Sequence, residues 1–107
     1  MVDEISPEEL SSLLASGGDV RIVDIRTKPA YEREHIPGSE NMPLHSLSEH
    51  VSALAGAETV VTVCPHGRAS KQAVKLITSY EGIDEETRVA SLEDGLEAWD
   101  GDLDASE

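Results

Sequence analysis

The stretch that decides the fold is Thr59-Val60-Val61-Thr62-Val63-Cys64-Pro65-His66-Gly67-Arg68-Ala69-Ser70. Its first five residues are all β-branched, which predicts a strand over Thr59–Val63 that is covered on both faces, as in parallel sheets. Gly67 indicates a tight loop after this strand. Residues 69–80 then have the apolar spacing of an amphipathic helix that Gly82 ends. A strand, a loop and a helix in this order are typical of α/β domains with parallel sheets.

The flanking sequence repeats this alternation of strands and helices. Ser6 followed by Pro7 and Glu9 indicates a capped helix start with a capping box, and Gly17-Gly18 indicates where that helix ends. We expect further strands over residues 20–25, 39–42 and 87–90, and further helices over residues 29–34, 46–54 and 93–99. These elements predict an α/β domain with a mostly parallel sheet and right-handed crossovers.

Length and charge limit the classes of function. The chain has 107 residues, so we expect one domain over 1–107, with 100–107 as a frayed acidic tail. Eight basic and 22 acidic residues give a formal net charge of −14, which argues against binding nucleic acid or an anionic membrane. No apolar run is long enough to span a membrane and no signal peptide opens the chain, so we expect a soluble, cytoplasmic protein.

The acidic composition also predicts a response to salt. Phe is absent, and self-repulsion at this net charge would be screened at high ionic strength. The composition resembles that of proteins from salt-loving microbes. The alternative is an ordinary acidic protein of a mesophile.

Cys64 is the candidate reactive residue. It follows the strongest predicted strand, at the sheet edge where open parallel sheets bind ligands. Gly67 lets the loop turn its N–H groups inward as an anion-binding nest, while the following helix N-terminus and Arg68 add positive charge. Together these features favour the thiolate, which is the nucleophile. The alternative is a buried core cysteine, which loop residues such as Pro65 and His66 disfavour.

The remaining candidates are weaker. A single cysteine excludes an internal disulfide and a relay between two cysteines of the chain. The four histidines and Cys64 lack the paired spacing of zinc sites, so we expect no metal. No cofactor is implied. Trp99 is expected to anchor the last helix in the core.

Three segments together resemble the rhodanese (thiosulfate sulfurtransferase) domain, in order and over most of the chain. The loop from Cys64 to Ser70 is similar to the active-site loop of that family. The two other matching segments are Val23-Asp24-Ile25-Arg26 with Tyr31 and His35-Ile36-Pro37-Gly38-Ser39-Glu40-Asn41-Met42-Pro43, and Leu92-Glu93-Asp94-Gly95-Leu96-Glu97-Ala98-Trp99.

The resemblance implies a rhodanese-like α/β fold with a mostly parallel sheet of about five strands and helices on both faces. It implies a sulfurtransferase in which the Cys64 thiolate takes sulfur from an anionic donor such as thiosulfate, becomes a persulfide, and passes the sulfur to a thiophilic acceptor such as cyanide or a thiol. The backbone from Pro65 to Ser70 (Pro65, His66, Gly67, Arg68, Ala69, Ser70) would hold the sulfur, and Arg68 would bind the donor. Asp24 and Arg26 would form a supporting ion pair.

The sequence departs from the family pattern at a few positions. Glu34, Ser39 and Asp94 stand where the family has Gly, Ala and Gly. The fifth position after the cysteine, commonly Arg or Thr, is Ala69, and Arg68 precedes it. The cationic residue of the loop is therefore displaced by one position. We expect this displacement to affect which sulfur donor is preferred more than whether the protein is active.

Three alternatives stay open from the sequence. A cysteine phosphatase or arsenate reductase would place Arg six positions after the cysteine, where this chain has Ser70, and an intramolecular arsenate reductase would also use a second cysteine. A non-catalytic interaction module would not need Cys64. A persulfide carrier fed by a partner protein of a sulfur relay would use the same cysteine, so sequence does not separate it from a thiosulfate-using enzyme.

Overall fold

A computed structural model describes residues 2–17, 19–101 and 103–105. Five strands form one sheet in the order β1-β5-β4-β2-β3, and every pair of neighbours is parallel. The strands are β1 (Glu4–Ile5), β2 (Val20–Asp24), β3 (Glu40–Asn41), β4 (Thr59–Val63) and β5 (Arg88–Leu92). The predicted α/β class with a five-stranded parallel sheet is therefore confirmed.

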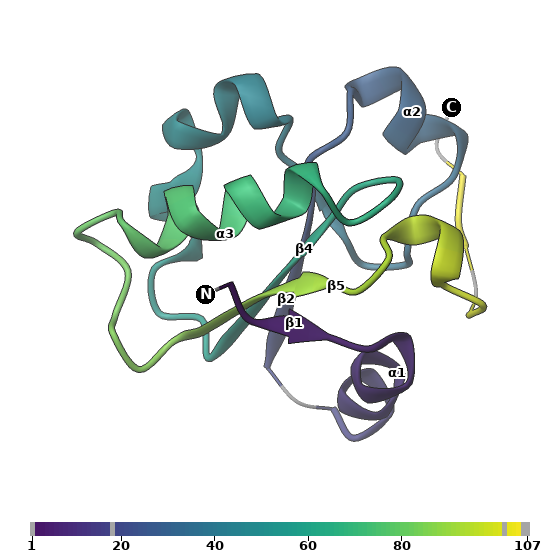
Figure 1. Cartoon of the computed structure of the whole chain (residues 1–107), viewed down its shortest axis with the longest axis horizontal. Helices are drawn as coiled ribbons and strands as arrows, with labels where there is room; N and C mark the ends of the chain where they lie inside the picture. The colour runs from purple at the N-terminus through teal and green to yellow at the C-terminus, as the bar shows by residue number, and fades with distance from the viewer. Residues whose placement is uncertain (1, 18, 102, 106–107) are drawn as a thin grey trace.

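Helical segments cover both faces of this sheet (Figure 1). They are α1 (Pro7–Ala15), α2 (Lys28–Arg33), α3 (Ala69–Thr78) and three 3₁₀ helices, η1 (Leu44–Glu49), η2 (Val51–Leu54) and η3 (Leu96–Ala98). In Figure 1, α3 and the teal η1–η2 segment lie on one side of the strands, and α1 lies on the other.

The alternation of side chains along β4 divides the core into two clusters. Val60 and Cys64 point to the side of α3, η1 and η2, where they pack with residues such as Ala73, Ile77 and Leu47. Val61 and Val63 point to the side of α1, where they pack with a second set: Ile5, Leu10, Ile22, Ile36, Ala90 and Leu92. Both faces of β4 are apolar because both are covered.

Local signals set the first helix as predicted, with one difference. The Ser6 hydroxyl accepts a hydrogen bond from the Glu9 N–H at 3.1 Å, and Pro7 occupies the first turn. The Glu9 carboxylate does not complete a capping box, because it accepts a hydrogen bond from Arg88 Nη1 at 2.7 Å instead. The backbone takes a positive φ at Gly17 just after the helix, and Gly18 lies outside the described residues.

Two of the predicted helices are short 3₁₀ helices. Residues 46–54 form η1 and η2, which meet at His50. Residues 93–99 contain only the short η3, because Asp94 and Gly95 have φ of 61° and 73°, outside the right-handed helical region. Trp99, at the end of η3, is half-buried against the core cluster on the α1 side, so it anchors a short 3₁₀ helix.

Other boundaries moved slightly, and one strand was missed. α3 ends at Thr78, so Tyr80 lies beyond it and is exposed instead of completing the apolar stripe. Leu14 in α1 is also exposed. The two-residue strand β1 was not predicted.

The predicted frayed tail is corrected in part. Asp104 and His35 form an antiparallel bridge, with a backbone hydrogen bond of 2.8 Å in each direction. His35 is buried, and its ring stacks on Tyr31 at 3.9 Å between centroids. Within the tail, residues 102, 106 and 107 lie outside the described part.

Candidate active site

Cys64 lies directly after β4, at the carboxyl end of the parallel strands, as predicted. Its side chain is buried, with a relative exposure of 2%. The Gly67 and Ser70 N–H groups donate to Sγ at 3.0 and 3.3 Å. Two loop N–H groups thus point at the sulfur, which stabilises negative charge on it.

The loop needs Gly67 at its turn. Gly67 has φ of 86°, and a Cβ there would lie 3.1 Å from the Asp94 nitrogen. Ser70 is fully buried in the first turn of α3, whereas Pro65, His66 and Arg68 are exposed. The predicted loop residues therefore divide into an inner pair that contacts the sulfur and an outer group that faces solvent.

The N-cap and first residues of η3 hold the start of this loop in place. The Leu96 N–H donates to the Cys64 carbonyl at 2.7 Å, and the Glu97 N–H donates to the Pro65 carbonyl at 3.2 Å. Gly95 lies so close that a Cβ would be 2.5 Å from both carbonyl oxygens. Sequence reasoning took this segment as an α-helix and missed the contact.

Asp24 and Arg26 form the predicted ion pair beside the site. Arg26 Nη2 lies 2.7 Å from Asp24 Oδ2, and both side chains are largely buried. Arg26 also donates to the Glu34 carbonyl at 2.6 Å, while Asn41 Nδ2 donates to the Asp24 and Arg26 carbonyls. The pair therefore connects the end of β2 to the end of α2 and to β3.

A pocket of about 340 Å³ opens onto the cysteine. It is lined by Ile25, Arg26, Thr27, Ala30, Leu44, Cys64, Pro65 and Ala69. Most of these side chains are apolar, and the lining cation is Arg26, whose charge Asp24 balances. Arg68 is exposed at the start of α3 and does not belong to this lining.

His66 contacts a carboxylate instead of the sulfur. Its Nδ1 pairs with the Glu97 carboxylate, and both side chains are mostly exposed. The described residues contain no group of three or more His, Cys, Asp or Glu side chains placed to hold a metal ion. No helix among the described residues is long and apolar enough to cross a membrane.

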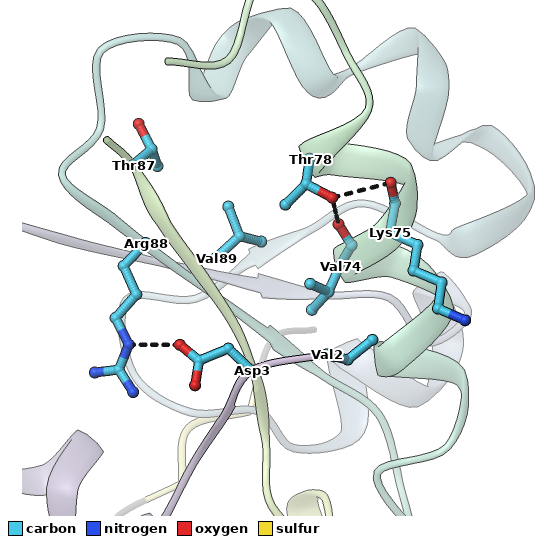
Figure 2. A pocket seen from close by; sticks show the side chains of 8 residues that line it. All are labelled: Val2, Asp3, Val74, Lys75, Thr78, Thr87, Arg88 and Val89. Atoms are coloured by element: carbon cyan, nitrogen blue, oxygen red, sulfur yellow. Dashed lines mark hydrogen bonds and ion pairs between the residues drawn. The ribbon is translucent and has the colours of Figure 1, made fainter. Parts of the chain in front are cut away.

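A second hollow lies at the opposite end of the strands (Figure 2). It is lined by Val2, Asp3, Val74, Lys75, Thr78, Thr87, Arg88 and Val89. Arg88 pairs with Thr59 at the start of β4, whereas Cys64 follows the end of that strand. Hydrogen bonds to Asp3 and Glu9 raise the pKa of Arg88 above its ordinary value, and Figure 2 shows Arg88 turned toward Asp3. This hollow is separate from the cysteine site.

A parallel five-stranded sheet with a cysteine loop between its central strand and a helix defines a class of α/β domain with its candidate site at that loop. The sequence pattern of the rhodanese-like domain matches residues 6–102. The chain belongs to the rhodanese-like domain family.

Individual relatives agree with this assignment. The chain is 36% identical to the thiosulfate sulfurtransferase GlpE of Pseudomonas fluorescens, over 89% of this chain and 82% of that protein. It is 35% identical to a sulfurtransferase of Allochromatium vinosum, over 92% and 89% of the two chains. Among solved structures, the human single-domain sulfurtransferase matches with a TM-score of 0.77 at 27% identity, covering 92% of this chain and 96% of that one.

Proposed function

We propose that this protein is a sulfurtransferase that moves a sulfane sulfur through a persulfide on Cys64. The observation that carries the proposal is the pair of N–H groups of Gly67 and Ser70, at 3.0 and 3.3 Å from Sγ, beneath an open pocket. Donors aimed at a sulfur stabilise the thiolate that attacks and the thiolate that leaves. The names of the relatives support the same reaction class.

The reaction consists of two displacements on sulfur. First, the Cys64 thiolate attacks the outer sulfur of thiosulfate; an S–S bond forms to Sγ, the S–S bond of thiosulfate breaks, and sulfite leaves with its electron pair. Second, an acceptor such as cyanide or a thiolate attacks the outer sulfur of the persulfide, and Cys64 leaves as the thiolate. No external oxidant or reductant is needed, because each nucleophile supplies the electron pair of the new bond and each leaving group, sulfite and then the Cys64 thiolate, keeps the pair of the broken S–S bond.

The surroundings assign further roles within this proposal. The apolar walls of the pocket, from Ile25 to Ala69, exclude water from the reacting sulfur. Arg68, exposed at the N-cap of α3, attracts the anionic donor against the net charge of −14. Asp24 and Arg26 keep the loops after β2 and α2 in place.

The geometry favours sulfur over phosphorus. An oxyanion site of the phosphatase kind would use a cation six residues after the cysteine. Ser70 holds this position and is fully buried with its hydroxyl 3.3 Å from Sγ. A tetrahedral oxyanion would find no cation there.

The first test is the intact mass of the protein after incubation with thiosulfate, followed by cyanide. We expect a gain of one sulfur on the wild type, lost on cyanide addition with release of thiocyanate. Cys64→Ser is the control, and it should fold normally and gain no sulfur. An unmodified wild type with a thiol still open to alkylation would contradict use of thiosulfate and direct the search to a protein donor or to a binding role.

A further inference from the structure

A pair of buried serine hydroxyls lies beneath the reacting sulfur. The Cys64 thiol donates to Ser70 Oγ at 3.3 Å, and Ser70 Oγ lies 2.5 Å from Ser91 Oγ. Ser70 and Ser91 are fully buried, and Cys64 is nearly so. The three groups form a chain from the sulfur into the interior, away from the pocket.

Strand register explains why Ser91 reaches this place. Ser91 in β5 pairs with Thr62 in β4, so its side chain shares a face with Thr62 and, two residues along, with Cys64. This face is the one that α3 covers, and Ser70 comes from the first turn of α3. Ser91 lies 27 positions after Cys64 in the chain, beyond the reach of any local motif.

The pair is a weak source of stability. A buried hydroxyl pair contributes little net free energy of folding compared with apolar side chains of the same shape. Either serine can donate in the bond between them. The contact between Ser70 Oγ and Cys64 Sγ is therefore the one that can affect the chemistry of the site.

We propose that Ser91 is a positioning residue that orients the Ser70 hydroxyl toward the Cys64 thiolate. In the thiol form, the Cys64 S–H donates to Ser70 Oγ and Ser70 donates to Ser91. In the thiolate form, the order reverses: Ser91 donates to Ser70, and Ser70 donates to Sγ. Hydrogen bonds to charged groups are stronger than neutral ones, and a chain of donors polarises each member, so the reversed order favours the thiolate.

This inference rests on the proposed function, because the thiolate serves as nucleophile in the first displacement and as leaving group in the second. Its test can nevertheless be made without any sulfur transfer. The chain has one cysteine, so alkylation by iodoacetamide and the ultraviolet absorbance of the thiolate both report on Cys64 alone.

The experiment measures the midpoint of the pH profile of alkylation in Ser70→Ala, Ser91→Ala and the double variant. We expect Ser70→Ala to raise the midpoint by about 0.5–1 pH unit, the effect of losing one hydrogen bond to the thiolate. Ser91→Ala should raise it by less. In the double variant, the midpoint should equal that of Ser70→Ala, because Ser91 acts only through Ser70.

Thr62→Val is the matched control. Its hydroxyl is equally buried on the same face and donates to the Ser70 carbonyl at 2.8 Å, but the structure gives it no bond to the sulfur. Its midpoint should stay at the wild-type value. A midpoint for Ser91→Ala equal to the wild type, or a matching rise in Thr62→Val, would overturn the inference.

Sulfur transfer from thiosulfate to cyanide gives a second readout. We expect kcat to fall several-fold in Ser70→Ala with a smaller change in KM, because the hydroxyl contacts the reacting sulfur and not the donor anion. If the wild type transfers no sulfur while the midpoints move as expected, the proposed function fails and the positioning role stands. If Ser91→Ala does not fold, a wild-type midpoint in Ser70→Ala still refutes the role.

Discussion

At the scale of single residues, Gly95 controls how closely η3 approaches the cysteine loop. It has φ of 73°, and a Cβ would lie 2.5 Å from the Cys64 and Pro65 carbonyl oxygens. We expect Gly95→Ala to lower the free energy of unfolding by about 3 kcal/mol or more, because left-handed strain adds to a clash with fixed backbone. Urea denaturation measures this change.

Gly56→Ala is the control for this prediction. Gly56 has φ of 90°, but nothing lies within 4 Å of the place its Cβ would take. In this variant the free energy of unfolding should fall by only about 1 kcal/mol, the cost of placing an alanine in the left-handed backbone conformation. An equal fall in the free energy of unfolding for Gly95→Ala and Gly56→Ala would show that the close approach of Gly95 to the cysteine loop adds nothing to the cost.

Sequence reasoning at this scale found the residues that local chemistry reveals. Cys64 and Gly67 stand in one loop, and a strand end, a glycine and a helix start are visible in the sequence. Ser91 could not be found in this way, because its contact depends on the register between β5 and β4. Gly95 looked like part of a helix, since nothing local shows which backbone it approaches.

At the scale of elements, the buried pair of Asp24 and Arg26 connects three segments. We expect Asp24→Ala to lower the free energy of unfolding by about 3–5 kcal/mol, because it leaves the Arg26 guanidinium buried without its carboxylate. Chemical denaturation checks the loss. Sulfur loading of the folded fraction should fall as well, since Arg26 also lines the pocket.

An exposed ion pair provides the comparison. Asp3 pairs with Arg88 at 2.9 Å, and both side chains are more than a third exposed. Asp3→Ala should therefore change stability by no more than about 1 kcal/mol. A similar loss in the two variants would mean that burial does not set the strength of the Asp24 pair.

The elements differ in how far the sequence predicts them. β4 and α1 were predicted well, because five β-branched residues and a Ser6-Pro7 start are strong local signals. The sequence predicts one helix where the structure has the two 3₁₀ segments η1 and η2, since their apolar residues Leu47, Val51 and Leu54 also suit an α-helical spacing. These residues pack with α3 in one core cluster, a tertiary contact that the local sequence does not show.

At the scale of the whole molecule, a formal net charge of −14 is carried by a small domain. The radius of gyration is 12.5 Å, comparable to the screening length of about 10 Å at 0.1 M salt, so acidic groups across the surface repel one another. We expect the Tm to rise by several degrees between about 0.1 and 1 M NaCl, where the screening length falls to about 3 Å. Differential scanning calorimetry measures this rise.

A variant with less negative charge provides the control for the salt response. Glu85→Gln with Glu86→Gln removes two exposed carboxylates outside the site. Its Tm should lie above that of the wild type at low salt and gain less from added NaCl. A Tm that does not change with salt would refute the adaptation to high salt that the composition predicts.

The synthesis of β5 decides when the reaction centre can be completed, because Ser91 lies in this strand. Glu4, near the start of the chain, pairs with Ser91, and the Ser91 N–H donates to the Asp3 carbonyl. A contact between residues so distant in sequence forms late in folding, and it cannot form on the ribosome until β5 has left the exit tunnel. During synthesis, Cys64 therefore emerges well before the strand that carries the hydroxyl beneath it. For that interval the nascent chain carries a thiol without the serine hydroxyl beneath it, open to oxidants from every side and not only through the pocket of the finished protein.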